Sequence, residues 1–248
     1  MQQFDQYADA YNLVRAKIAY PEALYRDLVS RCGGVDAALD IGCGNGVSTI
    51  RLAPYFNYVE GADIGANLIE KAKFNYPAIR FSVSPAEEYS SQKKFDLITS
   101  ATSFYWMDRD IVLQRIKSLL KNKGVFCAYK YDFPVAYGPL RDLIEKELVT
   151  KWSQYRDVRL TSYDDTLERI DSSGGFASAE RHIFSNIIEL TPLEVGLFFL
   201  STSYVTRYID KQGGSAYAEE FLAKIQNTET NETVKINFDI HTFIASSQ

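Results

Sequence analysis

The stretch Leu39-Asp40-Ile41-Gly42-Cys43-Gly44-Asn45-Gly46 decides the fold class of this chain. A short apolar run over 37–41 predicts a buried strand that stops at this glycine turn, and a helix is expected directly after the turn. Glycines at such a turn let the backbone approach a ligand without a Cβ in the way. In a doubly wound α/β sheet, ligands bind at the carboxyl end of the first parallel strand. The stretch therefore predicts a ligand-binding turn, with a tight turn that binds nothing as the alternative.

An acidic residue completes the pattern. Asp63 lies 21 positions after Gly42, at the end of a second expected strand over 58–63. A carboxylate one strand over from the glycine turn can accept hydrogen bonds from both hydroxyls of a ribose. Asp63 as a helix cap is the alternative, because helix caps favour Asp. Together, the turn and the carboxylate predict a nucleoside cofactor.

The residues around the glycines favour one class of cofactor over another. A dinucleotide fingerprint requires glycine or alanine at the sixth motif position, where this chain has Val47. Asp40, just before the glycines, can attract a cationic amino group directly or through water, an arrangement that does not suit a pyrophosphate. The turn is therefore expected to bind a nucleoside with an amino group and not a nicotinamide dinucleotide.

The rest of the chain alternates short apolar runs with helical periods, which is typical of parallel βαβ units. Further strands are expected over 79–84, 95–100, 125–131 and 181–190, with helical stripes between the earlier ones. The clean alternation over 234–240 predicts a strand with one wet and one dry face. The expected fold class is α/β, a doubly wound and mostly parallel seven-stranded sheet with an antiparallel last strand.

Two helical additions decorate this expected sheet, at about 135–173 and 191–229. Thr191-Pro192-Leu193-Glu194 is a capping box with proline at the first helical position, which predicts a helix that begins there and runs to about Ile209. Both additions are too short to be separate domains. We therefore expect one domain over 1–248, in which the additions form a lid over the substrate.

Composition and charge exclude several classes of protein. The 248 residues are 46% apolar and 24% charged, an ordinary balance that rules out disorder as the main state. The 27 Lys and Arg against 32 Asp and Glu give a net charge of −5, whereas nucleic-acid binders usually carry a basic footprint. No apolar run approaches the roughly 18 residues that span a bilayer, and the N-terminal residues lack a signal region. Three distant cysteines indicate reduced thiols and no metal site. A cytoplasmic protein without nucleic-acid or membrane partners is expected.

The chain resembles the class I S-adenosylmethionine-dependent methyltransferases over roughly residues 4–131, and within them the small-molecule branch that includes trans-aconitate methyltransferase-like proteins. Residues 39–46 are similar to the first motif of that family, and Gly61-Ala62-Asp63-Ile64-Gly65 is similar to its acidic second-strand end. Phe95-Asp96-Leu97-Ile98 and Phe104-Tyr105-Trp106-Met107-Asp108 resemble its fourth-strand motif and the aromatic segment that follows. The resemblance implies a Rossmann-like methyltransferase fold with S-adenosyl-L-methionine as cofactor.

The resemblance also implies which side chains bind the cofactor and the substrate. The cofactor-binding set is Asp40, Gly42, Cys43, Gly44, Asp63, Ile64, Ala86, Glu87 and Ser100. The substrate-binding set is Tyr11, Arg15, Tyr20, Tyr105 and Trp106. For the substrate set, an amphipathic first helix and ordinary aromatic packing are the alternatives. No catalytic residue and no metal ligand is assigned.

Two positions depart from the pattern of that family. Ser84-Pro85-Ala86-Glu87 stands where the family commonly has Gly-Asp-Ala-Glu, whose Asp hydrogen-bonds the adenine amino group. Pro85 cannot make that contact through its side chain, so the backbone around Ala86 or the side chain of Glu87 is expected to replace it. Glu87 on a solvated face or at a helix start is the alternative. Tyr105 stands where relatives often carry His, so a candidate catalytic histidine is absent there.

The expected function is methyl transfer from S-adenosyl-L-methionine to a small-molecule acceptor by in-line displacement. Holding donor and acceptor in place can supply up to roughly 7–11 kcal/mol of the barrier. A carboxylate acceptor needs no general base, so the lack of a histidine base favours O-methylation of a carboxylate over that of an alcohol. A nucleic-acid methyltransferase, a nicotinamide-dependent oxidoreductase and a non-enzymatic cofactor-binding protein are the alternatives.

Overall fold

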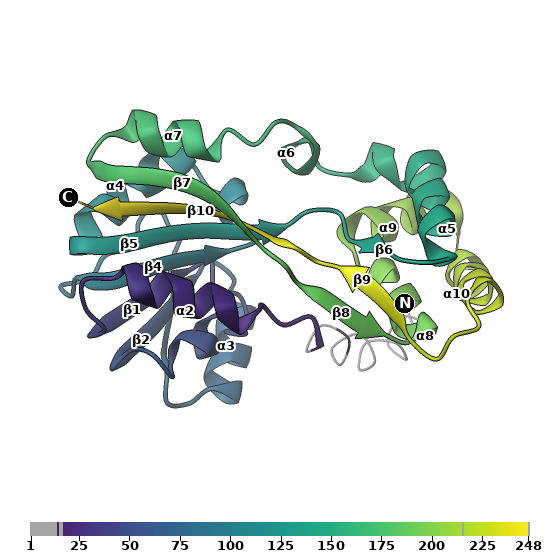
Figure 1. Ribbon diagram of the computed structural model, residues 1–248, viewed down its shortest axis with the longest axis horizontal. Coiled ribbons are helices and arrows are strands. Elements are labelled where there is room, and N and C mark those ends of the chain that lie inside the picture. The colour runs from purple at the N-terminus through teal and green to yellow at the C-terminus, as the bar shows by residue number, and fades with distance from the viewer. Residues whose placement is uncertain (1–13, 15–16, 215, 248) are drawn as a thin grey trace. The chain divides into compact units, whose positions relative to one another are not determined.

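The computed structural model describes Val14, residues 17–214 and residues 216–247 (Figure 1). The chain forms two compact units, and each is described by itself. The sheet unit comprises Tyr20–Tyr131, Tyr163–Phe184 and Ile240–Gln248. The accessory unit comprises Met1–Ala19, Asp132–Ser162 and Ser185–Asp239. The predicted substrate positions Tyr11 and Arg15 lie outside the described residues.

The sheet unit is built on one seven-stranded sheet with the strand order β3-β2-β1-β4-β5-β10-β7 (Figure 1). The neighbouring pairs among the first five strands are parallel, and β10 runs antiparallel to both β5 and β7. The strands are β1 Ala37–Ile41, β2 Tyr58–Asp63, β3 Arg80–Val83, β4 Phe95–Ala101, β5 Leu120–Tyr131, β7 Phe176–Phe184 and β10 Ile240–Ser247. This topology confirms the predicted fold class.

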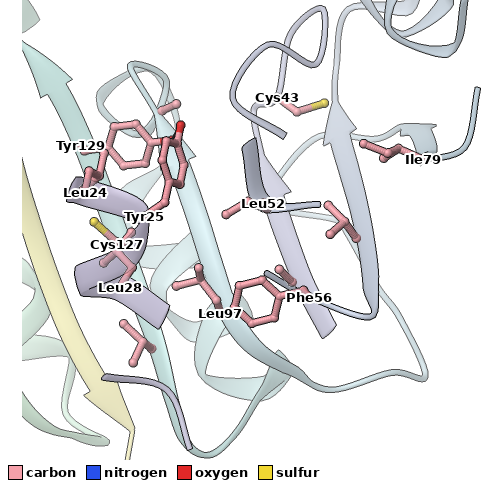
Figure 2. Close-up of a cluster of buried hydrophobic side chains, with 14 of the residues drawn as sticks. Leu24, Tyr25, Leu28, Cys43, Leu52, Phe56, Ile79, Leu97, Cys127 and Tyr129 are labelled. Atoms are coloured by element: carbon pink, nitrogen blue, oxygen red, sulfur yellow. Dashed lines mark hydrogen bonds between the residues drawn. The ribbon is translucent and has the colours of Figure 1, made fainter. Parts of the chain in front are cut away.

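Helices cover both faces of this sheet, so its central strands are buried on both sides. Helices α2 Glu22–Arg31 and α3 Ala66–Asn75 contribute to the apolar cluster on one face, and α4 Arg109–Leu119 and α7 Thr166–Ser173 to the cluster on the other. Along β5, Cys127 and Tyr129 join the first cluster, whereas Phe126 and Ala128 join the second. Figure 2 shows how Leu24, Tyr25 and Leu28 of α2 lie against Cys127 and Tyr129. Burial of each large apolar side chain stabilises this layer by roughly 1.5–3 kcal/mol.

The helix predicted directly after the glycine turn is wrong in type. The structure has a 3₁₀ turn there, η1 Thr49–Leu52, and no regular α-helix between the glycine turn and β2. The Ser48 and Thr49 hydroxyls donate to the Asp40 carboxylate below the turn. Side-chain hydroxyls with local or tertiary acceptors compete with regular helix geometry. The turn is therefore shaped by a buried polar contact and not by helix propensity.

The accessory unit combines a three-stranded antiparallel sheet with short helices. Its strand order is β6-β9-β8. The strands are β6 Val135–Ala136, β8 Ile187–Leu190 and β9 Val234–Asn237. The helical segments are α5 Leu140–Glu147, η3 Leu148–Trp152, η4 Ser153–Tyr155, α6 Val158–Thr161, α8 Pro192–Leu200, α9 Ser203–Tyr208, η5 Ile209–Gly213 and α10 Ala216–Thr228.

The predicted capping box is confirmed at the start of α8. The Glu194 amide donates to Thr191 Oγ1 at 3.3 Å, and the Thr191 amide donates to Glu194 Oε2 at 2.9 Å. The expected single helix to Ile209 is wrong, because Thr202 adopts an extended conformation with ψ 144° and separates α8 from α9. The sequence predicted the cap at Thr191 but did not predict the break at Thr202.

Two predicted strands are each divided between the two units. The strand expected over 181–190 becomes β7 and β8, and the alternation over 234–240 becomes β9 and the start of β10. Hydrogen bonds hold both breaks: the Asn186 amide donates to Asp239 Oδ1 at 2.9 Å, and the Phe238 amide donates to the Asn186 carbonyl at 2.8 Å. Polar residues that satisfy backbone groups locally end ladder pairing at these points.

The predicted helical additions fall unevenly on the two units. Residues 191–229 and the first part of 135–173 belong to the accessory unit, while α7 belongs to the sheet unit. There α7 packs against α4 and β7. The role of a substrate lid stays a prediction. Within residues 17–214 and 216–247, no helix has the length and apolar character needed to cross a bilayer.

Candidate functional site

The glycine turn, Asp63 and the residues after β4 lie at one edge of the sheet unit. The register pairs Asp40 of β1 with Gly61 of β2 on one side and with Thr99 of β4 on the other. The carboxyl ends of these three parallel strands therefore meet at the same edge. Ligands of doubly wound sheets bind at such an edge.

The backbone of the turn is left-handed at three glycines, Gly42, Gly44 and Gly46, with φ of 71°, 54° and 84°. The amides of Gly42 and Cys43 both donate to the Ala62 carbonyl, at 2.7 and 3.1 Å, which fixes the turn against β2. At Gly42 a Cβ would stand 2.4 Å from Ser103 Oγ, so packing as well as φ requires glycine there. At Gly44 a Cβ would meet no heavy atom within 4 Å. Gly44 therefore presents bare backbone to open space, as a ligand cradle requires.

Asp40 supports the turn from below. Its carboxylate is fully buried, with Ser48 and Thr49 hydroxyls donating to Oδ2 at 2.5 and 2.8 Å and the Thr99 hydroxyl donating to Oδ1 at 2.9 Å. Burial raises the pKa of Asp40, and the hydroxyl bonds act against that rise. The carboxylate ties the turn to β1 and β4, and its predicted contact with a cofactor amino group stays a prediction.

Asp63 lies directly beside the glycine turn. Its Oδ2 accepts from the Gly44 amide at 2.9 Å, and its Oδ1 accepts from the Gly65 amide at 2.7 Å. An ionised carboxylate offers about four acceptor positions, so roughly two remain for other donors. The side chain is only half-buried. The structure thus brings together the two sequence features that predicted a nucleoside site.

The alternative reading of Asp63 as a helix cap does not match this geometry. A capping side chain accepts from the second or third amide of the helix. Helix α3 begins at Ala66 with Gly65 at its N-cap, and no side chain caps it. Asp63 instead binds the amide of Gly65 itself and that of Gly44 across the turn. The carboxylate organises the turn and not the helix.

Apolar side chains flank Asp63 on the surface. Ile64 is 72% exposed, and Val83, which pairs with Asp63 across the β2–β3 register, is 53% exposed. Ligand sites combine apolar side chains with a few precisely placed polar groups. Ile64 was predicted from the sequence. Val83 was missed, because only the strand register reveals its place.

The residues after β3 connect to the start of α4. Ala86 is buried, and the Glu87 carboxylate accepts from the Asp108 amide at 2.8 Å. The Glu87 carbonyl accepts from the Arg115 guanidinium at 3.2 and 3.3 Å. Glu87 therefore fastens the turn after β3 to α4, and the expected adenine contact of Ala86 or Glu87 stays a prediction.

The segment after β4 packs under the glycine turn. Ser100 is buried and exchanges a hydrogen bond of 2.9 Å with Ser103, whose hydroxyl donates to the Ile41 carbonyl at 3.3 Å. Thr102 has a φ of 51°, a rare conformation for a β-branched residue, and its amide donates to the Tyr129 carbonyl at 2.7 Å. Strained residues of this kind cluster at functional sites. Ser103 and Thr102 were missed from sequence, where they read as ordinary loop residues.

Tyr20 belongs to a cluster of phenols at the end of β5. Its ring meets that of Tyr129 edge-on, with centroids 5.0 Å apart, and the Tyr129 and Tyr25 hydroxyls lie 3.3 Å apart. Desolvation raises the pKa of all three phenols above the usual value. These groups therefore stay protonated at neutral pH and cannot serve as phenolate bases.

Tyr105 and Trp106 form the 3₁₀ turn η2 Phe104–Trp106 with ring centroids 5.0 Å apart. Phe104 is buried in the core, but Trp106 is 42% exposed. The Lys130 ammonium lies 5.7 Å from the centre of the Tyr105 ring and 2.7 Å from Asp164 Oδ2. Tyr105, Lys130 and Asp164 line one small cavity together with Phe104 and Tyr129, and Trp106 does not line it. Among the described residues, no cluster of acidic, His and Cys side chains suits a metal ion.

Comparison with known proteins shows which family the chain belongs to. The family described as "Methyltransferase domain" matches residues 35–182. A Saccharomyces cerevisiae protein, provisionally assigned as an S-adenosylmethionine-dependent methyltransferase, is 31% identical over 159 residues, which are 56% of this chain and 54% of that protein. Trans-aconitate 2-methyltransferase of Methylobacterium radiotolerans is 31% identical over 98 residues, 38% of each chain. The chain thus spans about half the length, or less, of these curated relatives.

A solved structure supports the fold over a larger part of the chain. A provisionally assigned type II methyltransferase from Anaeromyxobacter dehalogenans has a TM-score of 0.78 at 20% identity, and the match covers 92% of this chain and 97% of that one. At this identity the likeness concerns the fold alone. The family match over 35–182 contains the glycine turn, Asp63 and the segment after β4.

Proposed function

We propose that this chain, which belongs to the methyltransferase domain family, transfers a methyl group from S-adenosyl-L-methionine to a small-molecule acceptor. The observation that carries the proposal is the contact between the Asp63 carboxylate and the Gly44 amide beside open space. This contact places a carboxylate that can bind a ribose beside exposed backbone, at the edge where doubly wound sheets bind ligands.

The residues of the turn fit this cofactor. The free acceptor positions of Asp63 suit the two ribose hydroxyls, and the open side of Gly44 suits close approach of the amino-acid portion. Exposed Ile64 and Val83 offer an apolar face to the adenine ring. Asp40 acts through the turn, because three hydroxyls hold its carboxylate under residues 48–49. When bound, the cofactor supplies an electrophilic methyl group on a positively charged sulfur.

The side chains near the strand ends favour catalysis by positioning. The buried phenols of Tyr20, Tyr25 and Tyr129 stay protonated, so they donate hydrogen bonds and do not remove protons. An acceptor that reacts through an oxygen already ionised at neutral pH needs no base. Alignment of donor and acceptor then accounts for up to roughly 7–11 kcal/mol of the barrier. We propose O-methylation of a carboxylate, which the similarity to trans-aconitate 2-methyltransferase supports.

Isothermal titration with S-adenosylhomocysteine tests the cofactor site. We expect wild-type protein to bind, and Asp63→Ala to bind at least tenfold more weakly, because hydrogen bonds to a charged group contribute roughly 1.5–3 kcal/mol each. Glu70→Ala, which removes an exposed carboxylate from α3 in the same unit, is the matched control and should bind as wild type. Failure of wild-type protein to bind at millimolar ligand would end the proposal.

A further inference from the structure

Arg156 of the accessory unit sits against aromatic rings. It directly follows η4 and precedes α6, and its side chain is half-buried. The guanidinium carbon lies 5.3 Å from the centre of the Phe133 ring and 6.0 Å from that of Tyr204. A guanidinium over aromatic faces is held by cation–π attraction, which fixes its plane. Three separate segments of the unit thus meet at this one cation.

The Nε atom of Arg156 is buried and has no hydrogen-bond partner among the described residues. Every other half-buried arginine in the described chain is satisfied: Arg31, Arg109 and Arg169 form ion pairs, and Arg115 donates to a carbonyl. A buried donor without an acceptor is costly, and such exceptions in native structures call for an explanation. Arg156 is therefore a preorganised donor whose Nε lacks an acceptor in the described part of the chain.

The neighbouring charges do not supply that acceptor. Asp157 is adjacent in sequence, but its carboxylate binds the Arg159 guanidinium at 2.9 Å and caps α6. The other nearby cation, Arg207, donates to the Tyr155 carbonyl at 3.2 Å. Neither neighbour therefore offers an anionic partner to the Arg156 guanidinium.

We propose that Arg156, with Phe133 and Tyr204, forms a binding site for a small organic carboxylate. The planar fork of a guanidinium matches a carboxylate through two parallel hydrogen bonds. The aromatic rings suit the carbon skeleton of such a ligand. The single charge of a carboxylate matches that of one guanidinium, which favours a carboxylate over a phosphate dianion. The site stands on contacts within the accessory unit alone, so it does not depend on the proposed methyl transfer.

Tryptophan fluorescence offers a direct binding assay. The chain has two tryptophans, and Trp106→Phe leaves Trp152 alone, whose ring lies 6.1 Å from that of Tyr204. In that background we would titrate acetate, phenylacetate and trans-aconitate, with their neutral methyl esters and inorganic phosphate as comparisons. We expect at least one carboxylate to give a saturable change in emission that its ester does not give. Absence of any saturable carboxylate signal up to roughly 10 mM, which sets the weakest Kd of interest, overturns the proposal.

Substitutions then assign the binding to the guanidinium. Arg156→Met should weaken carboxylate binding at least tenfold and leave the melting temperature unchanged or higher, because no protein hydrogen bond is lost. Arg156→Lys, which keeps the charge without the planar fork, should bind with intermediate affinity. Arg141→Met, which removes an exposed cation from α5 in the same unit, is the matched control for loss of charge and should bind within about twofold of its parent.

Two results would contradict the assignment. If Arg156→Met retains the affinity of its parent, the guanidinium is not the anion site. If inorganic phosphate binds more tightly than every carboxylate, and Arg156→Met abolishes that binding, the ligand of the site is a phosphate and not a carboxylate. A lower melting temperature for Arg156→Met than for Arg141→Met, with unchanged binding, would show a purely structural role.

Discussion

Substitution of Gly44 by alanine separates backbone strain from exclusion of the cofactor. The backbone φ there is 54°, and the added Cβ meets no protein atom within 4 Å. A left-handed backbone costs a non-glycine residue roughly 1–2 kcal/mol. In a chain of this size, that cost corresponds to a fall in melting temperature of about 2–8 °C. The methyl group would stand in the space that the proposed cofactor enters, so the Kd for S-adenosylhomocysteine should rise at least tenfold, about 1.4 kcal/mol.

Gly174→Ala is the control for strain alone. Gly174, at the end of α7 in the same unit, has a φ of 65° and equally open surroundings. Its ψ of 166° lies in a region that only glycine adopts readily, so its stability loss should match or exceed that of Gly44→Ala. Thermal melting and isothermal titration measure the two effects. Wild-type affinity in Gly44→Ala, or equal loss of affinity in both variants, would refute the proposed approach of the cofactor at Gly44.

Three further predictions concern stability and pH. Gly42→Ala should destabilise the protein more than Gly44→Ala, by over roughly 2 kcal/mol, because its Cβ would stand 2.4 Å from a serine hydroxyl oxygen; urea denaturation measures this. Asp40→Ala should lower the free energy of unfolding by at least about 2 kcal/mol, since three hydroxyls lose their acceptor, and an unchanged urea midpoint would contradict that role. Desolvation opposes ionisation of Glu147, but hydrogen bonds from Lys151 and a tyrosine outweigh it and lower the pKa of the carboxyl. The ionised Glu147 therefore stabilises the fold above its unfolded pKa, near 4.3, and this stabilisation is lost as the pH falls through the folded pKa. Acid titration followed by tryptophan emission should show this loss in wild type and not in Glu147→Gln, and identical titrations would contradict it.

The parts of the sheet unit that were predictable are those fixed by local patterns. Strands β1 and β2 match their expected bounds, because each apolar run ends at a residue with a distinct role, Gly42 and Asp63. The pairing of the turn with that carboxylate followed from strand order and was also predictable. These features depend on a few neighbouring residues and on the general topology of parallel sheets.

The features that sequence reasoning missed depend on contacts between distant residues. The 3₁₀ turn after the glycines exists because Ser48 and Thr49 turn to Asp40, which also binds Thr99 of another strand. The alternation over 234–240 gave no sign of its break, which rests on bonds to Asn186. Side-chain contacts of this kind override local propensity.

Arg156 shows the same limit for the accessory unit. Its local sequence, Tyr155-Arg156-Asp157-Val158-Arg159, reads as a solvated cluster of charges. The rings that hold the guanidinium, Phe133 and Tyr204, lie 23 and 48 positions away in the chain. Only the fold shows that Arg159 is paired with Asp157 and that Arg156 is not.

The predicted lid can be tested through the internal organisation of the accessory unit. That unit has a core of its own, in which Trp152 stacks on Phe199 at 5.5 Å and meets Phe221 edge-on at 5.4 Å. The buried Glu147 accepts from the Tyr217 hydroxyl, which in turn accepts from Trp152 Nε1. A unit with such a core would act as a lid by moving as a body and not by folding on the ligand.

Hydrogen exchange distinguishes these two kinds of closure. The chain passes between the units at 19–20, 131–132, 162–163, 184–185 and 239–240. If the accessory unit is a lid, addition of S-adenosylhomocysteine with trans-aconitate should slow amide exchange near these crossings and on the accessory surface, while exchange in its core stays as in the free protein. Slower exchange throughout the core would instead show folding upon binding. Unchanged exchange at every crossing, under conditions where titration shows that S-adenosylhomocysteine is bound, would rule out the lid.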